Sequence, residues 1–282
     1  MLDWFKVKAQ YLLPKHLLSR FLGAVASKEL GAFTQFLIKS FIKAFKIDMQ
    51  EALHESPSDY KTFNAFFTRP LKEGIRPIQA TSQQLCHPVD GAVSQFGEIS
   101  GDRIFQAKGH DFSLTTLLGG KPELAAPFKG GKFATVYLAP KDYHRIHMPI
   151  EGKLTDTLHV PGELFSVNPL TAQNVPGLFA RNERVVTLFD TPVGKMAIVL
   201  VGATVVASIE TVWAGTITPP AGKYVQHWQH EKDDIKLAMG EEMGRFKLGS
   251  TIVLCFEPNK IDFEDMSAGM TTRLGHLLAS HV

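Results

Sequence analysis

Cysteine is scarce in this chain of 282 residues, which contains only Cys86 and Cys255. Both lie among apolar residues and form no CxxC pair, which argues against a disulfide framework or a thiolate metal site and favours a reducing compartment. An excess of charge is also missing, because 30 Lys and Arg residues stand against 28 Asp and Glu. A net charge of +2 gives no electrostatic reason to expect nucleic-acid binding.

Long apolar runs are missing as well. No window approaches the ~20 apolar residues that a membrane-spanning helix needs. The longest apolar stretch, residues 196–207, contains Gly202 and Thr204 and is rich in β-branched residues, so it predicts a buried strand. The N-terminus, MLDWFK, lacks the apolar core of a signal peptide. These absences predict a cytosolic protein, or one attached to a membrane surface from the cytosolic side.

Hydrophobic residues make up 44% of the chain, enough to bury one large domain or two small ones. Helical periodicity extends to about residue 65, and β-prone runs between Gly and Pro residues follow from about residue 85. We therefore expect an α+β fold, with N-terminal amphipathic helices (1–65) and a mainly antiparallel β core (66–282). The predicted strands are 92–96, 133–138, 184–189, 196–207, 210–217 and 251–256, and residues 219–249 predict an irregular connection.

The N-terminal region predicts two amphipathic helices. Pro14 fits the first turn of the first helix, which carries Leu17, Leu18, Phe21, Leu22 and Val25. The second helix has Phe33, Leu37, Phe41 and Phe45 on one face and Gln35, Lys39, Lys43 and Lys46 on the other. A basic helix rich in Phe is typical of a membrane-associating region. A helix that packs on the core and exposes its lysine face is an equally good interpretation.

The tripeptide Gly249-Ser250-Thr251 precedes an apolar run about thirty residues from the C-terminus. A serine in this position can attack the carbonyl of the preceding residue and cut its own chain. Gly249 suits that reaction, because a residue without Cβ tolerates the strained backbone that exposes its carbonyl. The alternative is an ordinary turn that starts a strand.

Three further clusters contain residue types that carry chemistry. HPVDGA (87–92) places Asp90 in a turn before a strand, which is also a common structural signal. YHRIHMP (143–149) holds His144 and His147 three residues apart, as exposed loop histidines or as two ligands of a metal site. The segment 66–78 is basic and aromatic, which fits either a simple connection or a contact with phosphate and lipid.

Together these clusters resemble the phosphatidylserine decarboxylase family along most of the chain, and most closely its bacterial, membrane-associated type. The resemblance implies that the chain cuts itself between Gly249 and Ser250, into a large β chain (1–249) and a small α chain (250–282). It also implies that Asp90, His147 and Ser250 form the self-cleavage triad, in which the imidazole accepts the serine proton and the carboxylate orients the imidazole. The segments that carry the resemblance are FFTRPLKEGIRPI (66–78), HPVDGAV (87–93), YHRIHMPIEG (143–152), GELFSVNP (162–169), NERV (182–185) and GEEMGRFKLGST (240–251).

The resemblance further implies a cofactor made from the protein's own backbone. An acyl shift and β-elimination would convert Ser250 into a covalent pyruvoyl group, which is a pyruvate unit bound to the chain. The resemblance implies no metal cofactor. The pyruvoyl group would form a Schiff base with the amine of phosphatidylserine and accept the electrons released with CO2, as pyridoxal phosphate does elsewhere. His144 would be the proton donor that completes decarboxylation to phosphatidylethanolamine.

The implied partners are phosphatidylserine, an anionic membrane surface and further copies of the chain in a homo-oligomer, without nucleic acid. The implied location is peripheral, on the cytoplasmic face of the inner membrane, with residues 66–282 as the catalytic domain.

Three other functions remain open from the residues alone. A serine hydrolase acting in trans would use the same Asp, His and Ser, but the GxSxG elbow typical of such enzymes is missing around Ser250. A lipid-surface binding module would depend only on the N-terminal helices. A zinc enzyme would combine His144 and His147 with His227 and His230.

Overall fold

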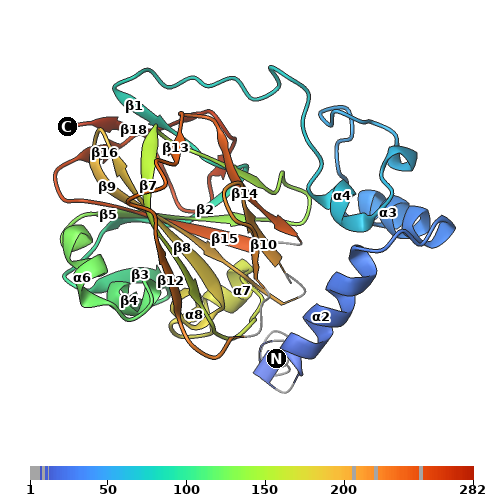
Figure 1. The fold of residues 1–282 in the computed structure, drawn as a ribbon, viewed down its shortest axis with the longest axis horizontal. Coiled ribbons are helices and arrows are strands. Elements are labelled where there is room, and N and C mark those ends of the chain that lie inside the picture. The colour runs from blue at the N-terminus through green and yellow to red at the C-terminus, as the bar shows by residue number, and fades with distance from the viewer. Residues whose placement is uncertain (1–6, 8–9, 12, 205–207, 219–221, 248–249) are drawn as a thin grey trace.

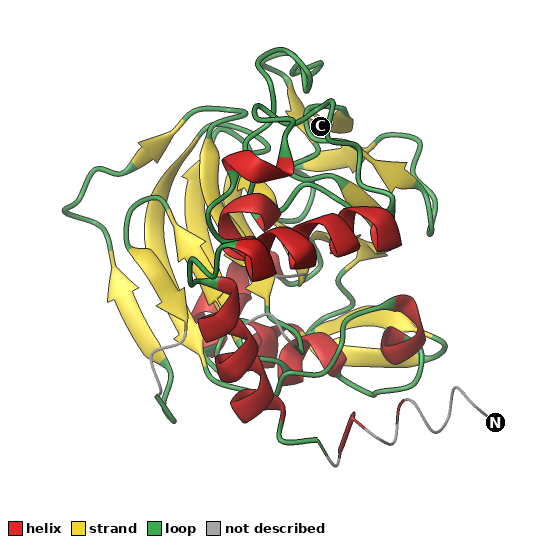
Figure 2. Cartoon of the chain, turned by 90° about the vertical axis from the view of Figure 1, so that its right-hand side faces the viewer, coloured by secondary structure: helices red, strands yellow, loops and turns green. Residues whose placement is uncertain are grey.

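The computed structural model of the chain describes residues 7, 10–11, 13–204, 208–218, 222–247 and 250–282. A β-rich body occupies most of the molecule, and the N-terminal helices lie along one side of it (Figure 1). Figure 2 looks at this side and shows the helices in front of the strands. These helices are α2 (Lys15–Ala26), α3 (Ala32–Phe45) and α4 (Phe63–Phe67), with a short 3₁₀ helix, η1 (Pro57–Asp59), before α4.

The body is built on one large sheet, which has nine strands in the described residues. Every neighbouring pair in it is antiparallel. The expected α+β fold with a mainly antiparallel core is therefore confirmed. The strands lie in the order β12 (Gln226–Gln229), β7 (Gly152–Val160), β8 (Arg184–Thr191), β9 (Gly194–Val201), β15 (Ser250–Phe256), β5 (Lys132–Leu138), β2 (Gly91–Glu98) and β17 (Thr271–Thr272), and β13 (Lys236–Leu237) also pairs with β7.

Smaller sheets and short helices surround the large sheet. One small sheet has the order β11 (Gly215–Thr218), β10 (Ser208–Thr211), β14 (Glu242–Lys247) and β6 (Arg145–His147). A second has the order β1 (Gln84–Cys86), β18 (Leu277–His281) and β16 (Ile261–Phe263), and β3 (Arg103–Ala107) pairs with β4 (His110–Ser113). The short helices of the body are α5 (Leu114–Leu117), α6 (Pro122–Ala125), η2 (Ala126–Phe128), α7 (Pro169–Ala172) and α8 (Leu178–Arg181).

The core is centred on β9 and β15, which lie side by side in the large sheet. Residues 196–201 and 252–255 are fully buried, so both strands are covered on both faces and read as continuous apolar runs. Cys255 lies in this core, and Cys86 is equally buried; both are free thiols, as their spacing predicts. Burial raises the pKa of each thiol to about 12, which makes both unreactive at neutral pH.

Both predicted N-terminal helices are present, but their buried faces differ from a simple core-packing pattern. In α2 the buried residues include Lys15 and Ser19, whereas Leu17 is 69% and Phe21 is 64% exposed. Lys15 reaches Glu163 at 2.8 Å and lies over the ring of Phe165. Two polar residues of α2 therefore face the body, while the apolar Leu17 and Phe21 stay exposed.

The second helix, α3, buries Thr34 and Ile38, while Leu37 and Phe41 are half-buried. Of the predicted apolar face, Phe33 and Phe45 are exposed. The three lysines of the opposite face are exposed as expected: Lys39, Lys43 and Lys46. Gln35, assigned to that face, is instead half-buried and donates a hydrogen bond to the carbonyl of Tyr60 at 3.0 Å.

Three predictions about strand positions were wrong. The strand predicted over 196–207 ends at Val201 in β9, and residues 205–207 lie outside the described residues. Residues 210–217 form two strands, β10 and β11, because the chain reverses between them and Gly215 adopts a positive φ of 65°. The supposedly irregular segment 219–249 contains β12, β13 and β14, although residues 219–221 and 248–249 lie outside the described residues. β12 and β14 are rich in polar residues, and their hydrogen bonds to β7, β10 and β6 provide the order that apolar alternation did not signal.

Candidate active site

The predicted cleavage site lies where the chain passes from one sheet to another. β14 ends at Lys247 in the four-stranded sheet, and β15 begins at Ser250 in the large sheet. Ser250 is paired with Leu138, the last residue of β5. Gly249 lies outside the described residues, as does the side chain of Ser250. The backbone nevertheless fixes which residues surround the start of β15.

Asp90 immediately precedes β2, beside the same end of β5. Gly91 makes this approach possible, because a Cβ on it would lie 2.4 Å from the carbonyl oxygen of Tyr137. The backbone carbonyl of Pro88, in the same turn, accepts a hydrogen bond from the backbone N–H of His147 at 2.9 Å. The turn that holds Asp90 therefore contacts both β5 and β6. It brings the predicted acid and base to the end of β5 where Leu138 pairs with Ser250.

The carboxylate of Asp90 is held by Arg76 and by a backbone N–H group. Arg76 Nε donates to both carboxylate oxygens, at 3.0 and 3.1 Å, and Nη2 donates to Oδ2 at 2.6 Å. The backbone N–H of Leu274 donates to Oδ1 at 2.9 Å. The described side chains of Asp90 and His147 share no hydrogen bond, and the negative charge of Asp90 works against the lowering of the pKa of His147.

His147 has both ring nitrogens engaged. Nδ1 lies 2.9 Å from the carbonyl oxygen of Gly240, which can only accept, so Nδ1 carries the proton. Nε2 is therefore the acceptor for the hydroxyl of Tyr143 at 3.2 Å. Burial lowers the pKa of His147 below its usual value. The ring is neutral at pH 7, with its basic nitrogen directed at Tyr143, which is the state that a general base requires.

His144 is fully buried between β5 and α4. Its Nε2 donates to the carbonyl of Ala139 at 3.1 Å, and its ring stacks on Phe67 with centroids 4.1 Å apart. Burial, assisted by the positive charge of Arg69, lowers the pKa of His144 to about 3. The resting imidazole is therefore neutral, and its role as a proton donor stays a prediction that requires protonation during the reaction.

A cleft of about 240 Å³ lies beside these residues. Arg69, at one wall, is only 4% exposed, and Nε and Nη1 of its guanidinium have no hydrogen-bond partner among the described residues. Asp142 accepts a hydrogen bond from the backbone N–H of Ala139, and burial raises its pKa. The other charged or polar groups that line the cleft are Lys46, Asp48, Glu51, Arg76, Asp90, Lys141, Tyr143, Thr271, Thr272 and Arg273.

Sequence reasoning missed Tyr143 and Arg76 as members of this site. Tyr143 stands in the motif YHRIHMPIEG, in which only the two histidines were predicted to carry chemistry. Arg76 stands in the basic segment 66–78, which suggested phosphate or lipid as its partner, whereas the partner is Asp90. Their presence in motifs beside the site was the available signal.

Two other motifs of the resemblance build the scaffold. Asn182 is fully buried and hydrogen bonds to both backbone groups of Phe165 and to the carbonyl of Gly202. Arg184 is buried without a carboxylate, and its guanidinium donates to the carbonyls of Thr116, Leu117 and Asn182. Burial lowers the pKa of Arg184 to about 9. Asn182 and Arg184 therefore join distant loops of the body.

The histidines of the zinc alternative have other partners. His227 bonds to Asp156 and Lys121, and His230 bonds to Asp233 and Thr157. Within the part of the chain that the structure describes, no group of three metal-binding side chains is brought together.

Comparison with known proteins gives consistent matches over nearly the whole chain. Residues 63–280 match a family model described as phosphatidylserine decarboxylase, and residues 5–46 match a model described as PSD. A relative from Alteromonas mediterranea is 71% identical over 99% of this chain and 87% of its own. Relatives from Pseudoalteromonas atlantica (64% identical, 99% of each chain) and Psychromonas ingrahamii (62% identical, 100% of this chain and 99% of its own) are equally well covered. All three are named phosphatidylserine decarboxylase proenzyme.

Proposed function

This chain belongs to the phosphatidylserine decarboxylase family, and we propose that it converts phosphatidylserine to phosphatidylethanolamine and CO2 after cutting itself between Gly249 and Ser250. One structural observation supports the proposal most strongly. The ends of β2, β5, β6 and β15 meet around the turn of Asp90, beside His147, a half-buried and neutral histidine.

In the self-cleavage step, Ser250 Oγ attacks the carbonyl carbon of Gly249. His147 Nε2 takes the hydroxyl proton, and the negative charge of Asp90 stabilises the imidazolium that forms. The bond from the Gly249 carbonyl to the Ser250 nitrogen breaks, the nitrogen takes a proton, and an ester remains. Tyr143 gives up its hydrogen bond to Nε2 before this transfer, because Nδ1 is already occupied by the Gly240 carbonyl.

The ester then breaks by β-elimination. Ser250 loses its Cα proton and the Gly249 carboxylate leaves, so that dehydroalanine remains at position 250. Dehydroalanine tautomerises to an imine, and water hydrolyses this imine to the pyruvoyl ketone and ammonia. The position of Ser250 fits this change, because Ser250 is the first residue of β15 and the backbone pairing with β5 begins there. A chain break before Ser250 leaves all of β15 in the sheet.

The pyruvoyl group would supply an electron sink for the loss of CO2. The protein's own residues then provide a dry site and a proton. His144 is the proposed proton donor. It is the last residue of the connection from β5 to β6, and this connection begins after Leu138, the residue that pairs with Ser250. Because burial holds its pKa near 3, the proton must arrive together with the reaction rather than be stored on the ring.

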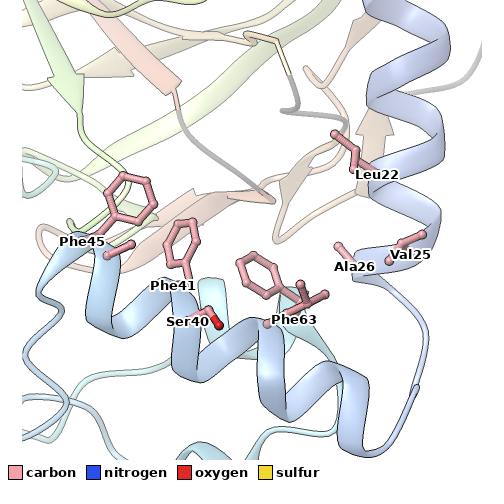
Figure 3. Close-up of a pocket in the computed structure, with 9 residues that line it drawn as sticks. Leu22, Val25, Ala26, Ser40, Phe41, Phe45 and Phe63 are labelled. Carbon is pink, nitrogen blue, oxygen red and sulfur yellow. The ribbon is translucent and has the colours of Figure 1, made fainter.

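A lipid surface is the proposed environment of the N-terminal region. An apolar groove of about 380 Å³ runs between α2 and α3, and Figure 3 shows Leu22 and Val25 of α2 facing Phe41 and Phe45 of α3, with Phe63 of α4 between them. Leu17 and Phe21 extend the apolar surface on α2. Lysines on α3 add charge that favours an anionic bilayer.

Among the described residues, no helix combines the length and apolar content needed to cross a membrane. We propose peripheral attachment at the cytoplasmic face of the inner membrane, with the large and small chains forming one enzyme that assembles as a homo-oligomer.

Intact-mass measurement of the purified protein under denaturing conditions tests the proposed function. The wild type should give a large chain ending at Gly249 and a chain of residues 250–282 with a blocked, pyruvoyl terminus. Ser250→Ala should give one intact chain and form no phosphatidylethanolamine, because it has no nucleophile and no precursor of the cofactor. Cleavage that persists in Ser250→Ala would refute the mechanism, whereas a trans-acting hydrolase would leave the wild-type chain whole.

A further inference from the structure

The side chain of Arg76 is the main partner of the Asp90 carboxylate. It is 7% exposed, and it gives Asp90 three hydrogen-bond contacts from two nitrogens. The second contact of Arg76 Nη2 is Glu51 Oε2 at 2.6 Å, and its Nη1 donates to the carbonyl of Ile75. Asp90, Glu51 and Ile75 thus hold the guanidinium from three directions. The contacts with Glu51 and Ile75 orient it independently of Asp90.

We propose that Arg76 is a positioning residue for self-cleavage, which acts by holding the Asp90 carboxylate in one orientation beside His147. This inference rests on the proposed function, because it assigns Asp90 to the cleavage step. The side chain of Arg76 bonds to Asp90, Glu51 and Ile75, and His147 is not among its partners.

Two physical reasons support this role. Burying a carboxylate costs free energy unless a cation and N–H groups compensate, and Asp90 has Arg76 and the Leu274 N–H for that purpose. A planar guanidinium also fixes the plane of a carboxylate through paired contacts, which an ammonium cannot do. The direction from which the negative charge of Asp90 acts on His147 therefore depends on Arg76.

The same contacts connect three segments of the chain. Glu51, which follows α3, accepts from Arg76 with one oxygen and lies 3.3 Å from Arg273 with the other. Leu274 and Arg273 belong to the small chain that cleavage would create, whereas Arg76 and Asp90 belong to the large chain. Residues from both sides of the cut therefore contribute to the polar contacts around Asp90 and Glu51.

The test measures the rate of self-cleavage in Arg76→Met and Arg76→Lys, by following precursor and product chains after synthesis in a cell-free system. Loss of the charge-assisted contacts should slow cleavage about 10- to 100-fold in Arg76→Met. Arg76→Lys should be intermediate, because it keeps the charge and loses the paired geometry. Arg103→Met is the matched control, since it removes an arginine from an exposed ion pair with Asp111 and should cleave at the wild-type rate.

A double mutant separates positioning from a general loss of structure. If Arg76 acts through Asp90, then Arg76→Met should add no further slowing to Asp90→Asn, and the Lys variant should behave in the same way. Thermal unfolding of each precursor reports stability separately, and Arg76→Lys carries the test if Arg76→Met does not fold.

Cleavage of Arg76→Met at the wild-type rate would overturn the inference, and so would slowing that multiplies with that of Asp90→Asn. A wild-type protein that neither cleaves nor forms phosphatidylethanolamine would instead overturn the proposed function, so the two failures are distinguishable.

Discussion

The N-terminal helices and the β body both have strong apolar patterns, but they use them in opposite ways. In β9 and β15 the apolar residues are fully buried against neighbouring strands. In α2 the residues turned toward the body include Lys15 and Ser19, and the exposed ones include Leu17 and Phe21. The same kind of apolar pattern is therefore used differently in the two regions, because α3 packs Ile38 into the core while α2 leaves Leu17 and Phe21 exposed.

The difference also separates the two requirements of the proposed enzyme. The body contains the whole predicted processing site, and the helices supply the apolar groove and the lysine face. If this division is correct, substitutions in the body should change chemistry without changing attachment to lipid, and substitutions on the helices should do the reverse.

The largest effect is expected from the acid and the base of the body. Asp90→Asn and His147→Ala should each slow self-cleavage about 10⁴-fold, because the serine loses its activated base or the charge that supports it. The double mutant should be scarcely slower than either single mutant, since such residues act as a unit. Densitometry of precursor and product chains measures this, and normal vesicle binding by the uncleaved proteins would sharpen the separation between the regions. Processing at the wild-type rate would remove both residues from the mechanism.

The next effect concerns His144, which should act after cleavage. His144→Ala should still cut the chain and form a pyruvoyl group that borohydride reduces. Its decarboxylation should fall about 10²–10⁴-fold if general acid catalysis is lost. Chain cleavage and phosphatidylethanolamine formation are measured on one preparation. A variant that does not cleave would instead assign His144, with its Ala139 hydrogen bond and Phe67 stacking, to folding or processing.

A smaller effect is expected from the helices. Leu17→Asp and Phe21→Asp should each weaken co-sedimentation with anionic vesicles about 10- to 100-fold, because each side chain loses about 1.5–3 kcal/mol of apolar burial in the bilayer. Self-cleavage should remain normal. Val212→Asp is the matched control, as Val212 is an exposed apolar residue of the body. Unchanged sedimentation of both helix variants would favour the interpretation in which the helices serve only the protein's own packing.

The smallest effect is expected from Tyr143→Phe, which removes only a hydroxyl. The hydrogen bond from Tyr143 to Nε2 favours neutral His147, so its loss should raise the pKa of His147. Self-cleavage needs the neutral ring and is lost as the pH falls through that pKa, which burial holds below 6.5. The acidic limb of the rate–pH profile should therefore move to higher pH in Tyr143→Phe, with a change of only a few-fold at pH 7. An unmoved acidic limb would show that the hydroxyl does not tune the base.

Much of the body could be predicted from apolar runs, and much of the rest could not. Residues 133–138 and 251–256 were recognised as strands because they are buried and β-branched or aromatic, and the structure places them side by side. β14 was missed because its polar residues pair across strands, as Glu242 does with Arg145 at 2.8 Å. Such a strand is specified by its neighbours, and neighbours distant in sequence leave no local pattern.

The candidate site shows the same limit. The types of Asp90 and His147 and their turns suggested chemistry, and the fold brings their turns together. What each side chain bonds to could not be read from spacing, because Arg76 reaches Asp90 and Gly240 reaches His147 through tertiary contacts. Separate contacts of this kind decide protonation and orientation, which residue identity alone does not.

The position of β15 has a consequence for the life of the processed protein. Seven residues of this strand, starting at Ser250, are paired with β5, and six of them are also paired with β9 on the other side. Cutting the chain before Ser250 removes the covalent link and leaves the pairing of residues 251–256 with both neighbouring strands in place. The small chain should therefore exchange with free copies of itself only as fast as the whole sheet opens. On the proposed mechanism, maturation is irreversible for two reasons. The chemistry at Ser250 cannot be reversed, and the small chain stays kinetically trapped between β5 and β9.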